Sequence, residues 1–360
     1  MNADVLHLSG PLLVGADEQR DQAWVVGGRL TFERPAGRDV TTIEGVVLPG
    51  LVDAHCHIGL DAHGAVDEAT SEAQALADRD AGALLLRDAG SPADTRWIDA
   101  REDLPRLVRA GRHIARTKRY VRNYAHEVEP DQLAATVTQE ARRGDGWVKI
   151  VGDWIDRDSG DLAPCWPLDA LRAAMAAAHD EGARVTAHCF GEDSLPDLIA
   201  SGIDCIEHAT GLTHDTTLAA ARAGIAVVPT LVNIATFPSL AAAGEAKFPA
   251  YAAHMRALHA RRQGTVRDAF DEGVPVYVGT DAGGNIPHGL VADEIAELVR
   301  AGLPPIAALD AGCWGARSWL LRPGLDEGAE ADLVVYPGDP REDVAALSHP
   351  RAVVLRGRVV

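Results

Sequence analysis

The sequence has few cysteines, few basic residues and no long apolar run, and each shortage excludes a class of protein. Its five cysteines are an odd number and show no Cys-x-x-Cys spacing, which argues against a disulfide framework and indicates a reducing compartment. The 34 basic side chains are outnumbered by 53 acidic ones, giving a formal charge of −19. Such a chain is a poor partner for nucleic acid or an anionic membrane surface. Without a signal peptide or a membrane-spanning stretch, we expect a cytoplasmic protein.

What the sequence does contain is a regular alternation of short apolar runs with Ala-rich amphipathic segments. The 360 residues, 47% of them hydrophobic, suit one large α/β barrel with a small accessory domain, or two medium domains. The clearest helix covers 170–179, and Gly182 just beyond it is a suitable C-terminal stop. The eight candidate strands are 51–55, 83–87, 113–118, 147–151, 184–188, 205–208, 226–230 and 276–280. Alternating strands and helices predict an α/β fold, a (β/α)8 TIM barrel with its chemistry at the C-terminal strand ends.

The two ends of the chain follow a different pattern. Short strands are expected at 5–9 and 23–32, the latter with a Gly27-Gly28 hairpin signal, and again at 331–336 and 352–360. We expect these ends to pair outside the barrel. The predicted domains are therefore a small β-sandwich from residues 1–48 and 326–360, and a barrel from residues 49–325.

Two histidines follow the apolar run that begins at Val46. A strand alternates its faces, so His55 and His57 would present both imidazoles on one side. Imidazole is the commonest metal ligand, so this spacing favours a metal-binding pair. The alternative interpretation is two polar residues at the end of a strand. Residues elsewhere in the chain are needed to choose between these two interpretations.

The stretch Pro49-Gly-Leu-Val-Asp-Ala-His-Cys-His57 resembles the signature of the amidohydrolase superfamily, which ends the first barrel strand. A second segment, Leu85-Leu-Arg-Asp-Ala-Gly90, resembles a motif of one branch, which contains Xaa-Pro dipeptidases, related amino-acyl hydrolases and the ochratoxin hydrolase. We interpret its Arg87 and Asp88 as an internal polar pair that shapes the barrel mouth, because buried charges usually satisfy each other. The resemblance covers essentially the whole chain.

Four further positions match the ligand sites of this family. They are Lys149 in Trp-Val-Lys-Ile, His188 at the end of 184–188, His208 in Ile-Glu-His-Ala-Thr, and Asp281 in Gly-Thr-Asp-Ala. Taken singly, the lysine reads as a partly exposed strand-end residue, each histidine as a core residue, and the aspartate as a turn or capping residue. Their joint occurrence favours ligands, since all but Lys149, which lies within the strand 147–151, fall at or near predicted strand ends. Glu207 should face away from its neighbour and support the ligands from behind.

The resemblance implies a binuclear metal centre. His55, His57 and Asp281 would hold one divalent ion, and His188 and His208 the other. Zinc is the default for such ligands. A carboxylated Lys149, formed by CO2 on an amine whose pKa burial lowers, and a hydroxide would bridge the ions. The hydroxide would attack the substrate carbonyl, and Asp281 would be the catalytic residue that carries its proton to the leaving group.

Substrate recognition is expected in the loops that follow the strands. The segment 118–126 is basic and aromatic in an otherwise acidic chain. Its Tyr120, Arg122 and Tyr124 are candidates for binding a substrate carboxylate, the alternative being a solvated loop. Further candidates for the rim of the site are His63, Asp153, Trp154, Asn233 and His288.

The resulting functional prediction is a metal-dependent hydrolase of an amide bond in a small molecule: a dipeptide, an N-acyl amino acid or a related amide. A hydrolase of a cyclic amide, lactone or ester from the same superfamily is the alternative, because it would share every ligand. A non-catalytic scaffold is disfavoured because no ligand position has been lost. The expected partner is a small-molecule substrate, with no nucleic acid and no membrane, and a homo-oligomer fits the family resemblance.

Overall fold

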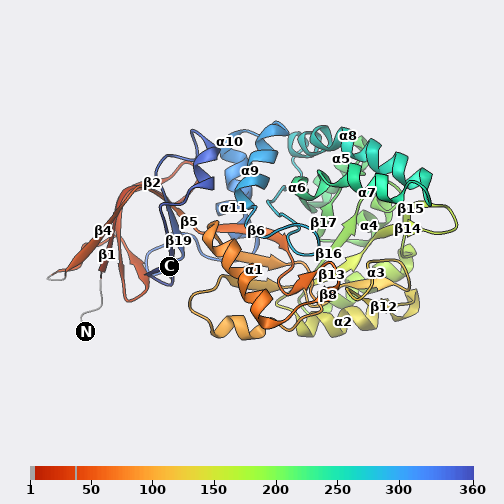
Figure 1. Cartoon of the computed structure of the whole chain (residues 1–360), viewed down its shortest axis with the longest axis horizontal. Helices are drawn as coiled ribbons and strands as arrows, with labels where there is room; N and C mark the ends of the chain where they lie inside the picture. The colour runs from red at the N-terminus through yellow and green to blue at the C-terminus, as the bar shows by residue number, and fades with distance from the viewer. Residues whose placement is uncertain (1–4, 37–38) are drawn as a thin grey trace.

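The structure, a computed structural model, describes residues 5–36 and 39–360. A sheet built from both ends of the chain lies beside a larger body of alternating strands and helices (Figure 1). Among the described residues, no helix combines the length and the apolar character needed to cross a bilayer.

The sheet beside the body contains strands from both chain ends. Its strands are β1 (Val5–Leu13), β2 (Gln19–Val26), β3 (Arg29–Thr31), β4 (Val40–Glu44), β5 (Val46–Pro49), β19 (Leu333–Tyr336), β20 (Ala352–Leu355) and β21 (Arg358–Val359). The two ends meet where β5 pairs antiparallel with β19. The glycine pair between β2 and β3 forms the expected hairpin turn. These strands form one hydrogen-bonded sheet, so the division into two sandwich layers and the exact domain boundaries remain predictions.

The larger body is organised around parallel strands. They are β6 (Leu51–Cys56), β9 (Ala83–Asp88), β10 (Arg106–Arg109), β11 (Ile114–Arg116), β13 (Trp147–Val151), β16 (Arg184–Cys189), β17 (Cys205–His208) and β18 (Ala226–Val228). One parallel group has the order β10-β9-β6, and another runs from β11 through β13, β16 and β17 to β18. The neighbours in space follow the order along the chain, as repeated βα units require.

The eighth expected strand, 276–280, is not a regular strand in the structure. Instead, single parallel bridges join Val276 to Val227 of β18, and Ala282 to Cys56 of β6. The amides of Ala54 and Asp281 contribute two further hydrogen bonds between this segment and β6. The segment therefore connects the last parallel strand to the first, although the ladder is interrupted.

The third expected strand, 113–118, contains β11, which pairs with β13. A further strand that was not predicted, β10, precedes it and pairs with β9. Gly111 lies between the two strands at a φ of 72°, a left-handed conformation that interrupts an extended run. A short strand, β12 (His126–Val128), adds to the free side of β11. Little in the sequence signals β10, because Arg106-Leu-Val-Arg109 contains only two apolar residues.

Helices follow most of these strands. They are α1 (Glu68–Asp80), α2 (Leu133–Arg143), α3 (Leu168–Asp180), α4 (Leu195–Ser201), α5 (His214–Ala223), α6 (Leu231–Ile234), α7 (Phe237–Gly244), α8 (Pro249–Asp271), α9 (Val291–Arg300), α10 (Pro305–Ala311) and α11 (Trp314–Trp319). The expected helix 170–179 is α3, and Gly182 follows it at a φ of 72°. The Asp67 side chain caps α1 by accepting from the Thr70 amide. Two hairpins, β7 (Leu60–Asp61) with β8 (Gly64–Ala65) and β14 (Asp153–Asp156) with β15 (Asp161–Pro164), lie in the loops.

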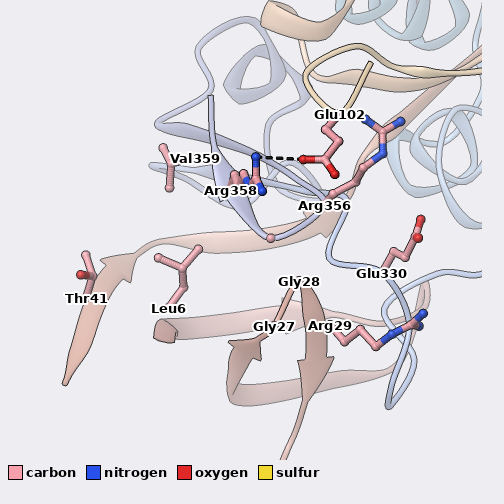
Figure 2. Close-up of a pocket in the computed structure, with 11 residues that line it drawn as sticks. Leu6, Gly27, Gly28, Arg29, Thr41, Glu102, Glu330, Arg356, Arg358 and Val359 are labelled. Atoms are coloured by element: carbon pink, nitrogen blue, oxygen red, sulfur yellow. Dashed lines mark ion pairs between the residues drawn. The ribbon is translucent and has the colours of Figure 1, made fainter. Parts of the chain in front are cut away.

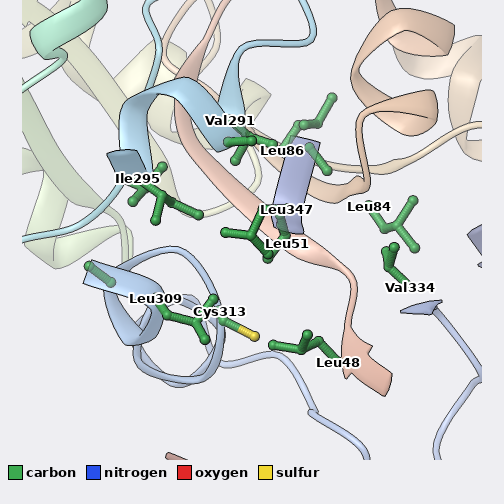
Figure 3. Close-up of a cluster of buried hydrophobic side chains, with 14 of the residues drawn as sticks. Leu48, Leu51, Leu84, Leu86, Val291, Ile295, Leu309, Cys313, Val334 and Leu347 are labelled. Atoms are coloured by element: carbon green, nitrogen blue, oxygen red, sulfur yellow. The ribbon is translucent and has the colours of Figure 1, made fainter. Parts of the chain in front are cut away.

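A single apolar cluster joins the terminal sheet to the body. Leu48 of β5 and Val334 of β19 belong to the same buried cluster as Leu51 of β6 and Leu84 of β9. Helices α9 and α10 close this cluster, with Ile295 among the contributing side chains (Figure 3). Burying these side chains in one core fixes the start of β6, and so the direction in which its histidine-bearing end points.

Candidate metal centre

The first two candidate ligands lie at the C-terminal end of β6. His55 is in the strand and His57 is one residue beyond it, and both are almost fully buried. Their Nε2 atoms are 3.2 Å apart. The i, i+2 spacing therefore does what strand geometry predicts: it brings both imidazoles to one point.

Asp281 completes this group from the eighth segment. Its Oδ1 lies 3.0 Å from His55 Nε2 and 2.9 Å from His57 Nε2. The Asn233 amide donates to the other oxygen, Oδ2, at 2.6 Å. Asp281 has a φ of 58°, a conformation that is unfavourable for residues with a side chain and tends to cluster at functional sites.

The tautomers of these histidines show why a cation fits here. His55 Nδ1 is 2.7 Å from the Glu207 carboxylate, and His57 Nδ1 is 2.7 Å from the Gly90 carbonyl. Both partners only accept, so each Nδ1 carries the proton and, in the neutral ring, each Nε2 carries a lone pair. Two lone pairs and a carboxylate oxygen then face one another, an arrangement that is repulsive without a positive charge between them. The donor set therefore fits a divalent metal.

The second pair of histidines lies next to the first group. His188 of β16 and His208 of β17 face each other with 3.0 Å between Nδ1 of the former and Nε2 of the latter. His208 Nδ1 is 2.7 Å from the Thr230 hydroxyl, and the His55 and His208 rings are 5.2 Å apart. Burial lowers the pKa of both His188 and His208 well below its usual value, so their rings are neutral and available as ligands.

Backbone strain accompanies these ligands. His208 has a φ of 65°, and Thr230, whose hydroxyl contacts it, has a φ of 48°. With Asp281, three strand-end residues near the centre adopt left-handed conformations. Such conformations persist only where surrounding contacts hold them, which is typical of a site that must aim its side chains.

Lys149 lies in the middle of β13 and is only 1% exposed. The alternative of a partly exposed strand-end lysine is therefore wrong. Burial lowers the pKa of its amine, while the charges of Glu207 and Asp281 oppose that shift. A neutral amine is the form that can take up CO2. The lysine thus has the burial that the bridging role requires.

Arg87 and Asp88 do not form the expected polar pair. Their side chains leave opposite faces of β9, because neighbouring residues on a strand alternate. Arg87 pairs with Glu207 at 2.6 Å, whereas Asp88 accepts from the Gly90 amide at 2.9 Å. Glu207, expected to support the ligands from behind, holds His55.

The segment 118–126 reaches the centre with one aromatic ring. The ring of Tyr120 is 5.6 Å from that of His188 and 4.8 Å from that of Trp154. The Tyr124 hydroxyl donates to the Asp61 carbonyl at 2.8 Å, which occupies it. Arg122 is exposed. Their substrate-binding roles therefore remain predictions, with Tyr120 in the most favourable position.

The five other rim candidates separate into two groups. Trp154 and Asp153 lie beside His188, the latter with 3.8 Å between Oδ1 and Nε2, and Asn233 contacts Asp281. His63 is exposed, and His288 pairs with Asp78 of α1 at 2.8 Å. The first group borders the centre, and His288 is occupied in fastening the loop after Asp281 to a helix.

Sequence reasoning missed His113, which lies between β10 and β11. It is fully buried, its ring is 5.0 Å from that of His57 and 5.4 Å from that of Tyr120, and neither ring nitrogen has a hydrogen-bond partner among the described residues. Phe190, 4.3 Å from His188 between ring centroids, was also missed. Phe190 follows the C-terminal end of β16, and that position was an available signal, whereas His113 stands at the start of the expected strand 113–118 and carried none.

A cavity of about 750 Å3 lies away from the candidate ligands. It is bordered by Arg29, Glu102, Glu330 and Arg356, between the terminal sheet and a loop of the body (Figure 2). None of the candidate ligands lines it. The candidate centre is therefore argued from its converging donor atoms and not from cavity size.

Comparison with known proteins agrees with the motifs. The model of the amidohydrolase family matches residues 46–360. An uncharacterised protein of Mycobacterium tuberculosis is 57% identical over 355 residues, covering 98% of this chain and 95% of that one. A solved Xaa-Pro dipeptidase with bound methionine has a TM-score of 0.82 at 22% identity, covering 99% of both chains. The ochratoxinase of Aspergillus niger has a TM-score of 0.80 at 21% identity, covering 100% of this chain and 96% of that one.

Proposed function

Because the chain belongs to the amidohydrolase family, we propose that it is a metal-dependent hydrolase that cleaves an amide bond in a small molecule, such as a dipeptide or an N-acyl amino acid. The observation that carries the proposal is the convergence of His55 Nε2, His57 Nε2 and Asp281 Oδ1 within 3.2 Å of one another. The parallel strand circuit supports a (β/α)8 barrel as the framework, since the ligands lie where its strands end.

The proposed centre holds two divalent ions, with zinc as the expected metal. His55, His57 and Asp281 would bind one ion, and His188 and His208 the other. Buried Lys149, carboxylated by CO2, would supply an anionic bridge between them. The described residues that can hold a metal include His55, His208 and Asp281 as one group of donor atoms lying within 4.8 Å of one another, which supports placing the two halves in contact.

When bound, the metal pair would lower the pKa of a water molecule and polarise the substrate carbonyl. The chain itself contributes the proton transfer. The Asn233 amide donates to Oδ2 of Asp281 and so holds the carboxylate in place while Oδ1 faces the centre. This carboxylate can accept a proton as the carbonyl is attacked and return it to the leaving amine.

The substrate side of the proposal rests on aromatic rings and on relatives. Tyr120, Trp154 and Phe190 form a wall around His188, which suits an apolar side chain next to the scissile bond. The names of the similar structures, Xaa-Pro dipeptidase and ochratoxinase, support a small substrate. Arg122, with Tyr120 and Tyr124, is the proposed site for its carboxylate. The buried, free cysteines and the acidic charge support a cytoplasmic enzyme that acts on a small molecule.

A hydrolysis screen tests this proposal. The protein is loaded with zinc in bicarbonate buffer and offered dipeptides, N-acyl amino acids, lactones and aryl esters beside its Asp281→Asn variant. Cleavage of an amide class by the wild type, absent in the variant, is the expected result. Turnover of lactones or esters with no amide cleaved would contradict the proposed bond specificity.

A further inference from the structure

A buried chain of contacts runs behind His55, away from the metal centre. Arg87 Nη2 donates to Glu207 Oε1 at 2.6 Å, and Glu207 Oε2 is 2.7 Å from His55 Nδ1. Arg87 and Glu207 are fully buried and His55 is 1% exposed. The three residues come from three different strands, β9, β17 and β6, so only the tertiary structure joins them.

Glu207 is held at both oxygens. Oε1 accepts from Arg87 and also from the Thr186 hydroxyl, while Oε2 faces His55. A carboxylate held in this way at both oxygens is an immobile acceptor for the proton on His55 Nδ1, which leaves Nε2 free to bind a metal.

Arg87 has no other countercharge in contact among the described residues. Its guanidinium lies over the rings of Trp147, at 4.6 Å, and Trp319, at 5.1 Å. Its Nε and Nη1 atoms have no hydrogen-bond partner among the described residues. Burying a charge with so few hydrogen bonds costs folding free energy. Packing alone therefore does not explain why an arginine contacts Glu207 here.

We propose that Arg87 is a positioning residue that acts through Glu207 to hold His55 in its metal-binding tautomer and orientation. Without Arg87, Glu207 Oε1 would lose a donor that holds it, and the carboxylate would be free to turn away from His55 Nδ1. The imidazole would then no longer be held with Nε2 facing Asp281 Oδ1. The proposal rests on the proposed metal-dependent function.

The chain offers a matched control in Arg184. Its guanidinium lies over the same two rings, 4.2 Å from Trp147 and 5.5 Å from Trp319, but it donates to the Trp319 carbonyl and not to Glu207. Substituting Arg184 therefore disturbs the same stack without touching the contact to His55. A role in packing against these rings alone predicts that substituting Arg184 also weakens metal binding.

The experiment measures zinc and cobalt affinity by competition with a chelator, together with the visible spectrum of the cobalt-loaded protein. Arg87→Met should weaken binding at the His55 side about 10- to 100-fold and change the cobalt spectrum, while Arg184→Met should leave both unchanged. Arg87→Lys keeps a charge beside Glu207 and should fall between, which preserves the test if Arg87→Met fails to fold. The double variant Arg87→Met/Glu207→Gln should bind metal no more weakly than Glu207→Gln alone, because Arg87 acts only through the Glu207 carboxylate.

Unchanged metal affinity in folded Arg87→Met or Arg87→Lys, or an equal loss in Arg184→Met, would overturn the proposal. A wild-type protein that binds no divalent metal would overturn the proposed function itself, and this outcome is distinct because it appears before any variant is compared.

Discussion

The two halves of the candidate metal centre differ in how firmly their side chains are held. On one side, His55 is fixed by Glu207, His57 by the Gly90 carbonyl and Asp281 by Asn233. On the other side, His208 contacts Thr230, but His188 Nε2 has no hydrogen-bond partner among the described residues. Its nearest carboxylate oxygen, on Asp153, is 3.8 Å away, too far for a hydrogen bond.

This difference indicates which group of ligands is already oriented before a metal ion binds. Partners behind a ligand fix its tautomer and ring orientation and raise metal affinity. The side of His55, His57 and Asp281 is therefore expected to bind the first ion tightly. The side of His188 and His208, surrounded by aromatic rings, is expected to bind the second ion more weakly and to lie closer to the substrate. Five predictions test this difference between the two sides of the centre.

The largest effect is expected for Asp281→Asn. The amide keeps the shape of the carboxylate but cannot accept the proton, so turnover should fall about 10²- to 10⁴-fold with metal still bound. The measurement is kcat on the substrate found by the screen, beside metal content by elemental analysis. Full activity in the purified variant would refute the assigned role.

Lys149→Ala tests the link between the halves. Without the bridging group, metal content should drop, the second ion first, and activity should fall with it. A short carboxylate added to the buffer should restore part of both by occupying the space of the missing bridge. If Lys149→Ala still bound two metal ions without added carboxylate, the proposed bridging role of Lys149 would be wrong.

His188→Ala tests the expected order of affinity directly. This variant should retain about one equivalent of metal after dialysis, because the His55 side is complete without it, whereas His57→Ala should lose the tightly bound equivalent. Metal content against chelator concentration provides the measurement. Equal losses of metal in the two variants would show that the two sides of the centre bind metal with similar affinity.

Asn233→Ala removes the partner of Asp281 Oδ2. A hydrogen bond to a charged group contributes about 1.5–3 kcal/mol, so kcat should fall roughly 10- to 100-fold while KM changes little. Steady-state kinetics on the same substrate measure kcat and KM separately. An effect on KM alone would assign Asn233 to substrate binding instead.

The smallest effect is expected for Arg122→Ala, because the side chain is exposed and exposed charges contribute about 1 kcal/mol or less. KM should rise severalfold for carboxylated substrates and stay constant for neutral ones. Comparing an N-acyl amino acid with its amide measures this. A uniform change for both substrates would count against carboxylate recognition.

Much of this centre was predictable because it depends on local rules. His55 and His57 converge by strand alternation, and His188, His208 and Asp281 lie at strand ends that the periodicity located. The short strand β10 was not predicted, because Arg106-Leu-Val-Arg109 contains only two apolar residues. The eighth predicted strand forms only isolated bridges, and the chain leaves the extended conformation at Asp281. A hydrophobic pattern encodes neither feature.

The alternation of strands and helices follows from residue type and short-range spacing, so the sequence was sufficient to predict it. The candidate ligand set also came from the sequence, through its resemblance to a family. What lies behind each candidate ligand is visible only in the folded chain. Arg87, adjacent to Asp88 in the chain, pairs instead with Glu207, 120 residues away, and His113 lies against His57 although no motif marks it. Contacts of this kind depend on which strand faces come together, and the fold alone sets that.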